Sequence, residues 1–204
     1  MKILIASNNQ HKILEISKIF QNIEFKDIEI SYPKKISDLN IQVEETGDTF
    51  EINAEIKSLA FFIFYNLPTL SDDSGLCVDA LNGAPGVHSA RFAGEDSNDK
   101  MNREKLIAEL EKLSLNESPA HFTCSLCFFD GENILRSTGK CFGKIITEER
   151  GLNGFGYDSM FIPNGFDQTF AEMEENLKNQ ISHRANALSN FLPIFANYYS
   201  RLKI

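Results

Sequence analysis

Two adjacent aspartates constrain this chain most, because they directly follow an apolar run. The run FFIFYNLPTL ends at residue 70, and SDDSG occupies residues 71–75. Two like charges beside an apolar segment are unfavourable unless a cation or a proton compensates them. The fold must therefore bring a cation or a proton to Asp72 and Asp73.

The start of the chain predicts a strand, a polar turn and a helix. The apolar run KILIA (2–6) is typical of a buried strand. Ser7, Asn8 or Asn9 can cap the helix that follows. Its apolar residues recur at helical spacing, namely Ile13, Ile16, Ile19 and Phe20. This arrangement points backbone N–H groups and the positive end of a helix dipole at any ligand bound there.

The rest of the chain alternates helix and strand patterns. Residues 22–45 favour a strand and a loop around Pro33, and residues 82–94 favour loop or turn. One helix is predicted from the capping box at Asp48 to about Tyr65, and a second from a cap at Ser97 to about Leu113. A third is predicted from the apolar face between Ala185 and Tyr199, and this helix contains Pro193. Strands are predicted at Leu67–Ser71 and on both sides of a hairpin at Asp130-Gly131. We expect an α/β fold with a mixed sheet, in one domain spanning 1–204.

Composition excludes several classes of protein. The formal net charge is −9 and the pI is about 5.0, which disfavours binding to nucleic acid polymers. No apolar run reaches the ~20 residues of a membrane span, and the apolar stretch in MKILIASNNQ is too short for a signal peptide. We expect a cytoplasmic protein that contacts no membrane.

The four cysteines include a CxxC pair, Cys124 and Cys127. The flanking HFTCSLCFF is typical of a strand, where positions i and i+3 point to opposite faces. The two thiols would then not converge, so the pattern favours structural thiols over a redox or zinc site.

Four polar clusters could carry chemistry. In SNNQHK, hydroxyl, amide and ammonium groups at a helix start suit a phosphate, although a capped helix with a surface lysine gives the same pattern. Glu45 with Asp72 and Asp73 offers the hard oxygen ligands that Mg²⁺ prefers, although solvated turn aspartates would look alike.

The other two clusters lie in the second half of the chain. In GFGYD, Phe155 and Tyr157 could stack on a planar ring, and Asp158 could accept a hydrogen bond from its edge, or the segment is only a glycine turn. In KNQISHR, His183 and Arg184 fall in a first helical turn, where cations oppose the dipole. An anionic or electron-rich ligand would remove that conflict, and fraying of the helix would remove it too.

Five segments resemble, in order, the signature segments of the Ham1-like (inosine triphosphate pyrophosphatase) family. They are SNNQHKILE, EETGDTFEINAEIKS, SDDSGLCVDALNGAPGVHSARFAG, GFGYDSMF and ISHRANAL. The resemblance implies a homodimer, with an elongated mixed sheet flanked by helices and a deep cleft between two lobes. It also implies Mg²⁺-dependent hydrolysis of ITP, dITP, XTP and dXTP to the monophosphate and pyrophosphate, which clears deaminated purines from the nucleotide pool.

The resemblance also implies roles for individual residues. Asp73 corresponds to the catalytic base and, with Glu45, to the magnesium ligands, and Asp72 would support them. The implied substrate contacts are Ser7, Asn8, Asn9, Gln10, His11, Lys12, Ser74, Phe155, Gly156, Tyr157, Asp158, Lys178, His183 and Arg184.

Three residues depart from the family pattern. His11 stands where glycine is common, His88 where tyrosine is common and Ser159 where proline is common. Two other interpretations remain: a Maf-like pyrophosphatase that acts on other nucleotides, and a protein that binds nucleotides without hydrolysing them.

Overall fold

The computed structural model describes residues 1–21, 27–36 and 41–202. The chain divides into two compact units. Unit 1 comprises Met1–Asp73, Cys124–Gly139 and Arg184–Ile204, and unit 2 comprises Ser74–Thr123 and Lys140–His183. Each unit has its own hydrophobic core, and each is described by itself.

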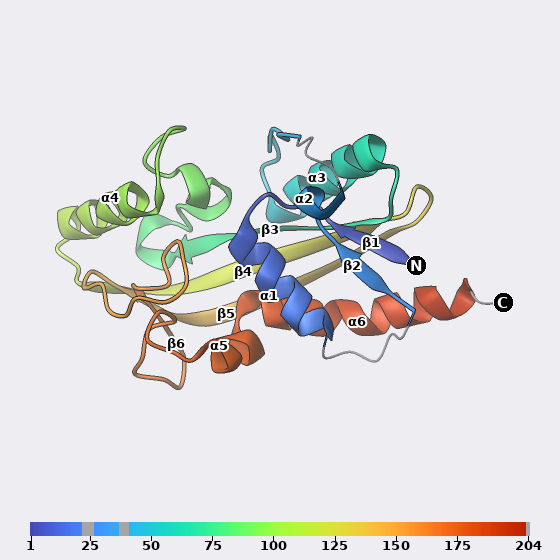
Figure 1. Ribbon diagram of the computed structural model, residues 1–204. Helices are drawn as coiled ribbons and strands as arrows, with labels where there is room; N and C mark the ends of the chain where they lie inside the picture. The colour runs from blue at the N-terminus through green and yellow to red at the C-terminus, as the bar shows by residue number, and fades with distance from the viewer. Residues whose placement is uncertain (22–26, 37–40, 203–204) are drawn as a thin grey trace. The chain divides into compact units, whose positions relative to one another are not determined.

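A six-stranded sheet in the order β2-β1-β3-β4-β5-β6 is the central element (Figure 1). Its strands are β1 Lys2–Ile5, β2 Glu29–Ser31, β3 Thr69–Val78, β4 Glu117–Phe129, β5 Ile134–Ile146 and β6 Phe161–Pro163. β1 pairs in parallel with β2 and β3, whereas β5 pairs antiparallel with β6. The predicted α/β class with a mixed sheet is therefore confirmed.

Six α-helices and two short 3₁₀ helices accompany the sheet in the described part of the chain. They are α1 Gln10–Gln21, α2 Pro33–Ile36, α3 Phe50–Tyr65, α4 Asp99–Lys112, α5 Glu175–Ile181, α6 His183–Arg201, η1 Asp79–Leu81 and η2 Gly86–Arg91. No helix among these residues is long and apolar enough to cross a membrane.

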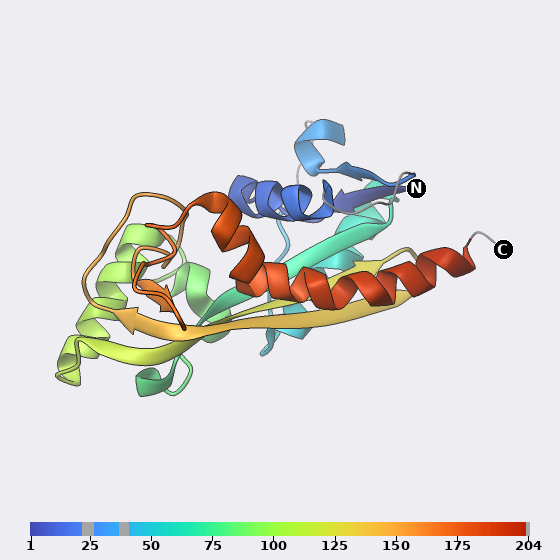
Figure 2. The same ribbon diagram turned by 90° about the horizontal axis from the view of Figure 1, so that it is seen from below.

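In unit 1, helices cover both faces of the sheet. Ile3 and Ile5 of β1 belong to a cluster that contains the apolar residues of α1 and α6. Leu4, between them, packs with Phe61 of α3 instead. Because successive side chains of a strand point to opposite faces, α1 and α6 lie on one face and α3 on the other (Figures 1 and 2). This division decides the surroundings of the β3 side chains that belong to unit 1, from Thr69 to Asp73.

In unit 2, aromatic rings form the core. Phe122 of β4 packs edge-on against Phe161 of β6, with ring centroids 4.8 Å apart, and also lies against Phe170. Leu106 and Leu110 of α4 complete the same cluster. The apolar face of α4 is thereby fixed against the sheet.

The predicted strand at Leu67–Ser71 is wrong in both its bounds. β3 begins at Thr69 and continues through SDDSG to Val78. The prediction ended the strand at Ser71, directly before the two aspartates. Both aspartates instead lie inside β3, where other side chains compensate them.

Two helix caps lie one residue later than predicted. Thr49, not Asp48, caps α3, because its Oγ1 accepts a hydrogen bond from the backbone N–H of Ile52 at 3.2 Å. Asn98, not Ser97, caps α4 through the N–H of Met101 at 3.1 Å. The predicted end of α3 at Tyr65 is confirmed.

The predictions for Pro33, for the hairpin and for the CxxC cysteines have different outcomes. Pro33 begins the short helix α2 instead of lying in a loop, because proline is favoured at a first helical position. The hairpin between β4 and β5 is confirmed, and Asp130 Oδ1 accepts hydrogen bonds from two N–H groups of its turn. Cys124 and Cys127 are buried and free, and burial raises the pKa of Cys124 to about 12.

We predict that Gly139→Ala destabilises the protein. A Cβ at this position of β5 would overlap the backbone of Ala187 in α6, where no flexible side chain can give way. Overpacking of this kind costs about 1–3 kcal/mol of unfolding free energy. Urea unfolding followed by circular dichroism measures the loss. The exposed neighbour Lys140→Ala is the control and should stay within about 0.5 kcal/mol of wild type; equal stability of the two variants would contradict the packing.

Candidate active site

Asp72 and Asp73 point to opposite faces of β3, as neighbours in a strand must. Leu70, two residues before Asp72, packs on the α1/α6 face. Ser71, two residues before Asp73, donates a hydrogen bond to the carbonyl of Ala54 in α3. The two carboxylates are adjacent in sequence and yet have different partners.

Asp72 lies among cations on the α1/α6 face. Its Oδ2 is 3.2 Å from Lys12 Nζ of α1 and 3.0 Å from Arg184 Nη2 of α6, and its side chain is fully buried. Burial alone would raise the pKa of Asp72, but the charges of Lys12, Arg184 and Lys57 outweigh it and hold that pKa well below its usual range. Asp72 is therefore a fixed negative charge.

Arg184 is held from two sides. Its guanidinium donates through Nη2 to the carboxylate of Asp72 and through Nη1 to the carboxylate of Glu15 in α1. Arg184 is 1% exposed, and Asp72 and Glu15 raise its pKa against the effect of burial. A buried guanidinium shared by two carboxylates fixes the start of α6 to α1 and β3.

Asp73 lies on the α3 face beside a lysine. Lys57 Nζ of α3 is 3.6 Å from Asp73 Oδ1 and 2.7 Å from Glu45 Oε1, so the two carboxylates share one ammonium group. Burial raises the pKa of Asp73 to about 6; Lys57 and Lys12 oppose the rise, and Glu45 and Asp72 add to it. Asp73 Oδ2 is buried, and no hydrogen-bond donor among the described residues reaches it.

Sequence reasoning missed Lys57 and Glu15. Both signals were visible, because each charged residue lies among buried positions of its helix. The buried positions of α3 are Phe50, Asn53, Ala54, Lys57, Ser58 and Phe61, at helical spacing. A lysine on such a stripe needs a carboxylate partner, and the nearby acidic motifs supply two.

The residues of SNNQHK divide between structural and exposed roles. Asn9 caps α1, because its Oδ1 accepts from the N–H groups of His11 and Lys12. Ser7 Oγ accepts from the N–H of Asn9, and Asn8 donates to the carbonyl of Ile41. Gln10 and the ring of His11 are exposed. Lys12 is the member of this cluster that joins the carboxylates of β3.

A second group of predicted residues lies in unit 2. Asp158 Oδ2 accepts hydrogen bonds from Lys178 Nζ and from the N–H of Phe155, both at 2.9 Å. The ring of Phe155 is half-buried, with Lys178 Nζ 5.2 Å from its centroid. The ring of Tyr157 is buried in the core of the unit, and its hydroxyl donates to the carbonyl of Ser89. Phe155 is therefore the better-exposed aromatic ring of this loop.

His183 and Ser74 complete the predicted residues of unit 2. The ring of His183 is 6% exposed and stacks on Phe122, with centroids 4.7 Å apart and planes at 15°. Ser74 follows Asp73 in β3 and is half-buried.

A metal ion at this site would be coordinated by few protein ligands. The described residues contain no group of three or more histidine, cysteine, aspartate or glutamate side chains placed to hold one. The pair formed by Glu45 and Asp73 fits Mg²⁺, which is bound through one or two carboxylates and keeps several waters. The buried Oδ2 of Asp73 is an oxygen of the required kind.

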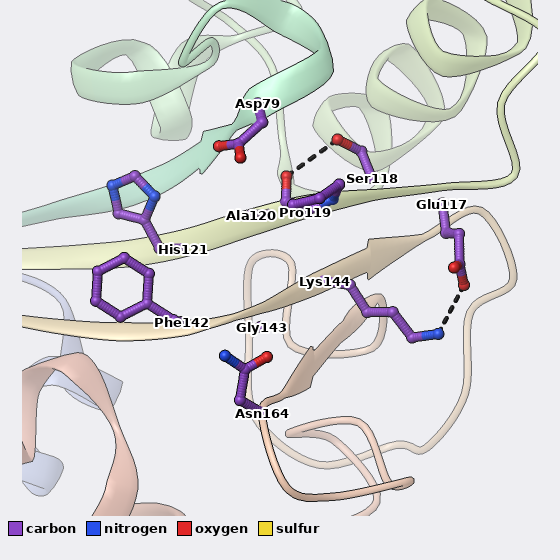
Figure 3. Close-up of a pocket in the computed structure, with 10 residues that line it drawn as sticks. All are labelled: Asp79, Glu117, Ser118, Pro119, Ala120, His121, Phe142, Gly143, Lys144 and Asn164. Carbon is purple, nitrogen blue, oxygen red and sulfur yellow. Dashed lines mark hydrogen bonds and ion pairs between the residues drawn. The ribbon is translucent and has the colours of Figure 1, made fainter.

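A pocket elsewhere in unit 2 is separate from these residues. It has a volume of about 510 Å³ and lies by β4, β5 and Asn164 (Figure 3). Its lining includes an ion pair between Lys144 and Glu117, and none of the predicted site residues. It therefore adds nothing to the site.

Comparison with known proteins identifies the family. The model of the Ham1 family matches residues 3–194. This chain belongs to the Ham1 family. The resemblance found in the sequence motifs is thereby confirmed over almost the whole chain.

Named and solved relatives agree with the Ham1 assignment. The chain is 43% identical over 195 residues to the dITP/XTP pyrophosphatase of Campylobacter jejuni subsp. doylei, and 44% identical over 191 residues to that of Nautilia profundicola; each alignment covers 92% of this chain and 94% of the relative. The Staphylococcus aureus Ham1 protein has a TM-score of 0.80 at 40% identity, covering 98% of this chain and 100% of its own. A HAM1 protein from Coxiella burnetii has a TM-score of 0.83 at 36% identity, covering 97% and 99%.

We predict that the same substitution at the two aspartates of this Ham1 protein destabilises it at one position and not at the other. Asp72→Asn leaves Arg184 and Lys12 short of a buried counter-charge, which should cost about 3–5 kcal/mol of unfolding free energy. Asp73→Asn removes a carboxylate whose raised pKa shows that its surroundings disfavour the charge, so stability should hold or rise. Urea unfolding at pH 8 with EDTA measures both variants.

The comparison has an internal control, because both variants replace one carboxylate of the same strand by an amide of the same shape. Equal destabilisation by the two substitutions would contradict the division between the two faces of β3.

Proposed function

We propose that this protein hydrolyses dITP, ITP, XTP and dXTP to the nucleoside monophosphate and pyrophosphate, in the cytoplasm, and so clears deaminated purines from the nucleotide pool. Family membership and relatives named dITP/XTP pyrophosphatase at 43–44% identity support a nucleoside-triphosphate pyrophosphatase. The observation that carries the chemistry is the pair of unlike aspartates in β3.

Glu45 and Asp73 would hold Mg²⁺. Both carboxylates converge on Lys57 Nζ, and oxygen donors of this type match the ion's preference. When bound, the ion supplies charge stabilisation to phosphate oxygens and lowers the pKa of water. Lys57 supplies part of the positive charge that keeps the two carboxylates together.

Asp73 would act as general base. Its pKa of about 6 lies near neutral pH, where a base is both ionised and able to accept a proton. In the hydrolysis, a water oxygen bonds to the α-phosphorus, its proton passes to Asp73, and the bond to the leaving pyrophosphate breaks. Asp72, with its lowered pKa, keeps its charge throughout and takes no proton.

Lys12 would bind the phosphates from the start of α1. Its ammonium lies beside Asp72 at 3.2 Å, with its side chain 15% exposed. Negative charge that accumulates on the phosphates is stabilised by a cation already in place. Arg184 and Glu15 would act through Asp72 by fixing it, and the helix start at Ser7, Asn8, Asn9, Gln10 and His11 would add backbone and side-chain donors.

The unit 2 residues would recognise the purine. The half-buried ring of Phe155 can stack on the base, and Asp158 and Lys178 can take part in hydrogen bonds at its edge. Hypoxanthine and xanthine carry a carbonyl at C6, whereas adenine carries an amino group. Donors from Lys178 or His183 would pair with the carbonyl and face the amino group donor to donor, which rejects adenine strongly.

Other candidate functions are less well supported. A Maf-like enzyme acting on other nucleotides would share a pyrophosphate-releasing mechanism, and a non-catalytic nucleotide-binding protein would not need Asp73 to have a pKa near neutrality. Neither has a specific observation in its favour. A homodimer is part of the proposal on the family resemblance alone.

We predict pyrophosphate release from dITP and XTP, and none comparable from dATP or dGTP, in the presence of Mg²⁺. Asp73→Asn should lower kcat for dITP by about 10²- to 10⁴-fold, because it removes the proton acceptor. A coupled assay of released pyrophosphate measures both. Asp96→Asn, at an exposed position of the chain, is the control and should retain wild-type turnover.

Three outcomes would contradict the proposal. Equal turnover of dITP and dGTP would contradict the proposed specificity. Turnover of pyrimidine or modified nucleotides in place of dITP would favour the Maf-like alternative. Tight binding of nucleotide without turnover would favour a non-catalytic binding protein.

A further inference from the structure

Helix α4 holds both backbone groups of Gly156. The N–H of Gly156 donates to Asp99 Oδ2 at 2.7 Å, and its carbonyl accepts from Arg103 Nη1 at 2.9 Å. Asp99 and Arg103 are four residues apart on α4 and so lie on one face of the helix. A single residue of the loop 149–159 is thus fixed on both sides by charged side chains.

Arg103 also ties two further parts of that loop together. Its Nε is 2.7 Å from Glu149 Oε2, and the same carboxylate oxygen accepts from Ser159 Oγ at 3.1 Å. The guanidinium fork therefore links Glu149 and Ser159 at the ends of the loop to Gly156 near its middle. An ammonium group, which lacks the planar fork, cannot make both contacts in the same geometry.

The contacts act on the segment that carries Phe155. Gly156 has φ of +60°, a conformation that few side-chain-bearing residues adopt. On one side of it, the N–H of Phe155 is bound to Asp158; on the other, the ring of Tyr157 is buried in the core. With the core anchoring Tyr157, the orientation of the Gly156 peptide groups sets where the ring of Phe155 lies.

We propose that Asp99 and Arg103 are positioning residues for purine binding: they hold Gly156 so that the ring of Phe155 is ordered before the nucleotide arrives. The proposal rests on the function proposed above for this loop. Ordering the loop in advance lowers the entropy cost of binding. The contacts described for Asp99 and Arg103 are with the loop 149–159, so the chemical step at Asp73 should not depend on them.

We call the contacts of Asp99 and Arg103 with Gly156 the clamp. Hydrogen exchange tests the clamp without reference to activity. In Arg103→Met, which keeps an unbranched side chain and removes the fork, exchange of the Gly156 amide and its neighbours should become about 10-fold faster, as expected when a hydrogen bond to a charged group is lost. Lys100→Met is the matched control, because Lys100 is an exposed lysine of the same helix whose ion pair is with Glu104. Asp99→Ala removes the other half of the clamp and should give the same result.

Steady-state kinetics with dITP then tests the consequence. Arg103→Met should raise KM about 10-fold and leave kcat within about 2-fold, with Arg103→Lys in between. Unchanged exchange, or a fall in kcat at constant KM, would overturn the positioning role. If the wild-type protein did not hydrolyse dITP, the proposed function would fail, and the exchange experiment would still decide whether the clamp exists.

Discussion

The structure of this site depends on one buried contact, between Asp72 and the cations of Lys12 and Arg184. It occupies the α1/α6 face of β3 and compensates the first of two adjacent carboxylates. Because neighbouring residues of a strand face opposite ways, the second carboxylate is left on the α3 face with Lys57 and Glu45. The same strand thereby presents a permanently charged aspartate and one whose pKa is raised to about 6.

Because they lie on opposite faces of β3, the two aspartates have different roles. Asp72 fixes Lys12 and, through Arg184 and Glu15, ties three elements of unit 1 together. Asp73 has a buried oxygen that no donor reaches among the described residues, and its charge is disfavoured. Such a group is unfavourable for stability and useful for binding a cation or accepting a proton. The disfavoured charge of Asp73 therefore lies at the position where the proposed reaction needs a base.

The sequence predicted the mixed α/β fold, because apolar periodicity and turn residues are local signals. It placed the C-terminal end of α3 and the turn of the β4–β5 hairpin correctly for the same reason. It missed the length of β3, since a strand that carries two buried carboxylates is stable only through Lys12, Lys57 and Arg184, which are distant in sequence. The motifs indicated Asp73 and Glu45, and Lys57 stands at helical spacing among the buried residues of α3. Its pairing with the two carboxylates could be assigned only once α3 was known to cover that face. The Gly156 clamp was equally invisible, because Asp99 and Arg103 are more than 50 residues away in the chain.

¹³C NMR of the aspartate carboxyl carbons in the metal-free protein decides whether the pKa of Asp73 is raised while that of Asp72 is lowered. A pH titration with EDTA, with Asp73→Asn used to assign the resonances, follows each carboxyl separately. We predict that Asp73 titrates near pH 6 and that Asp72 stays ionised to the lowest pH at which the fold persists. Titration of both groups together near pH 4, the ordinary value for aspartate, would contradict it.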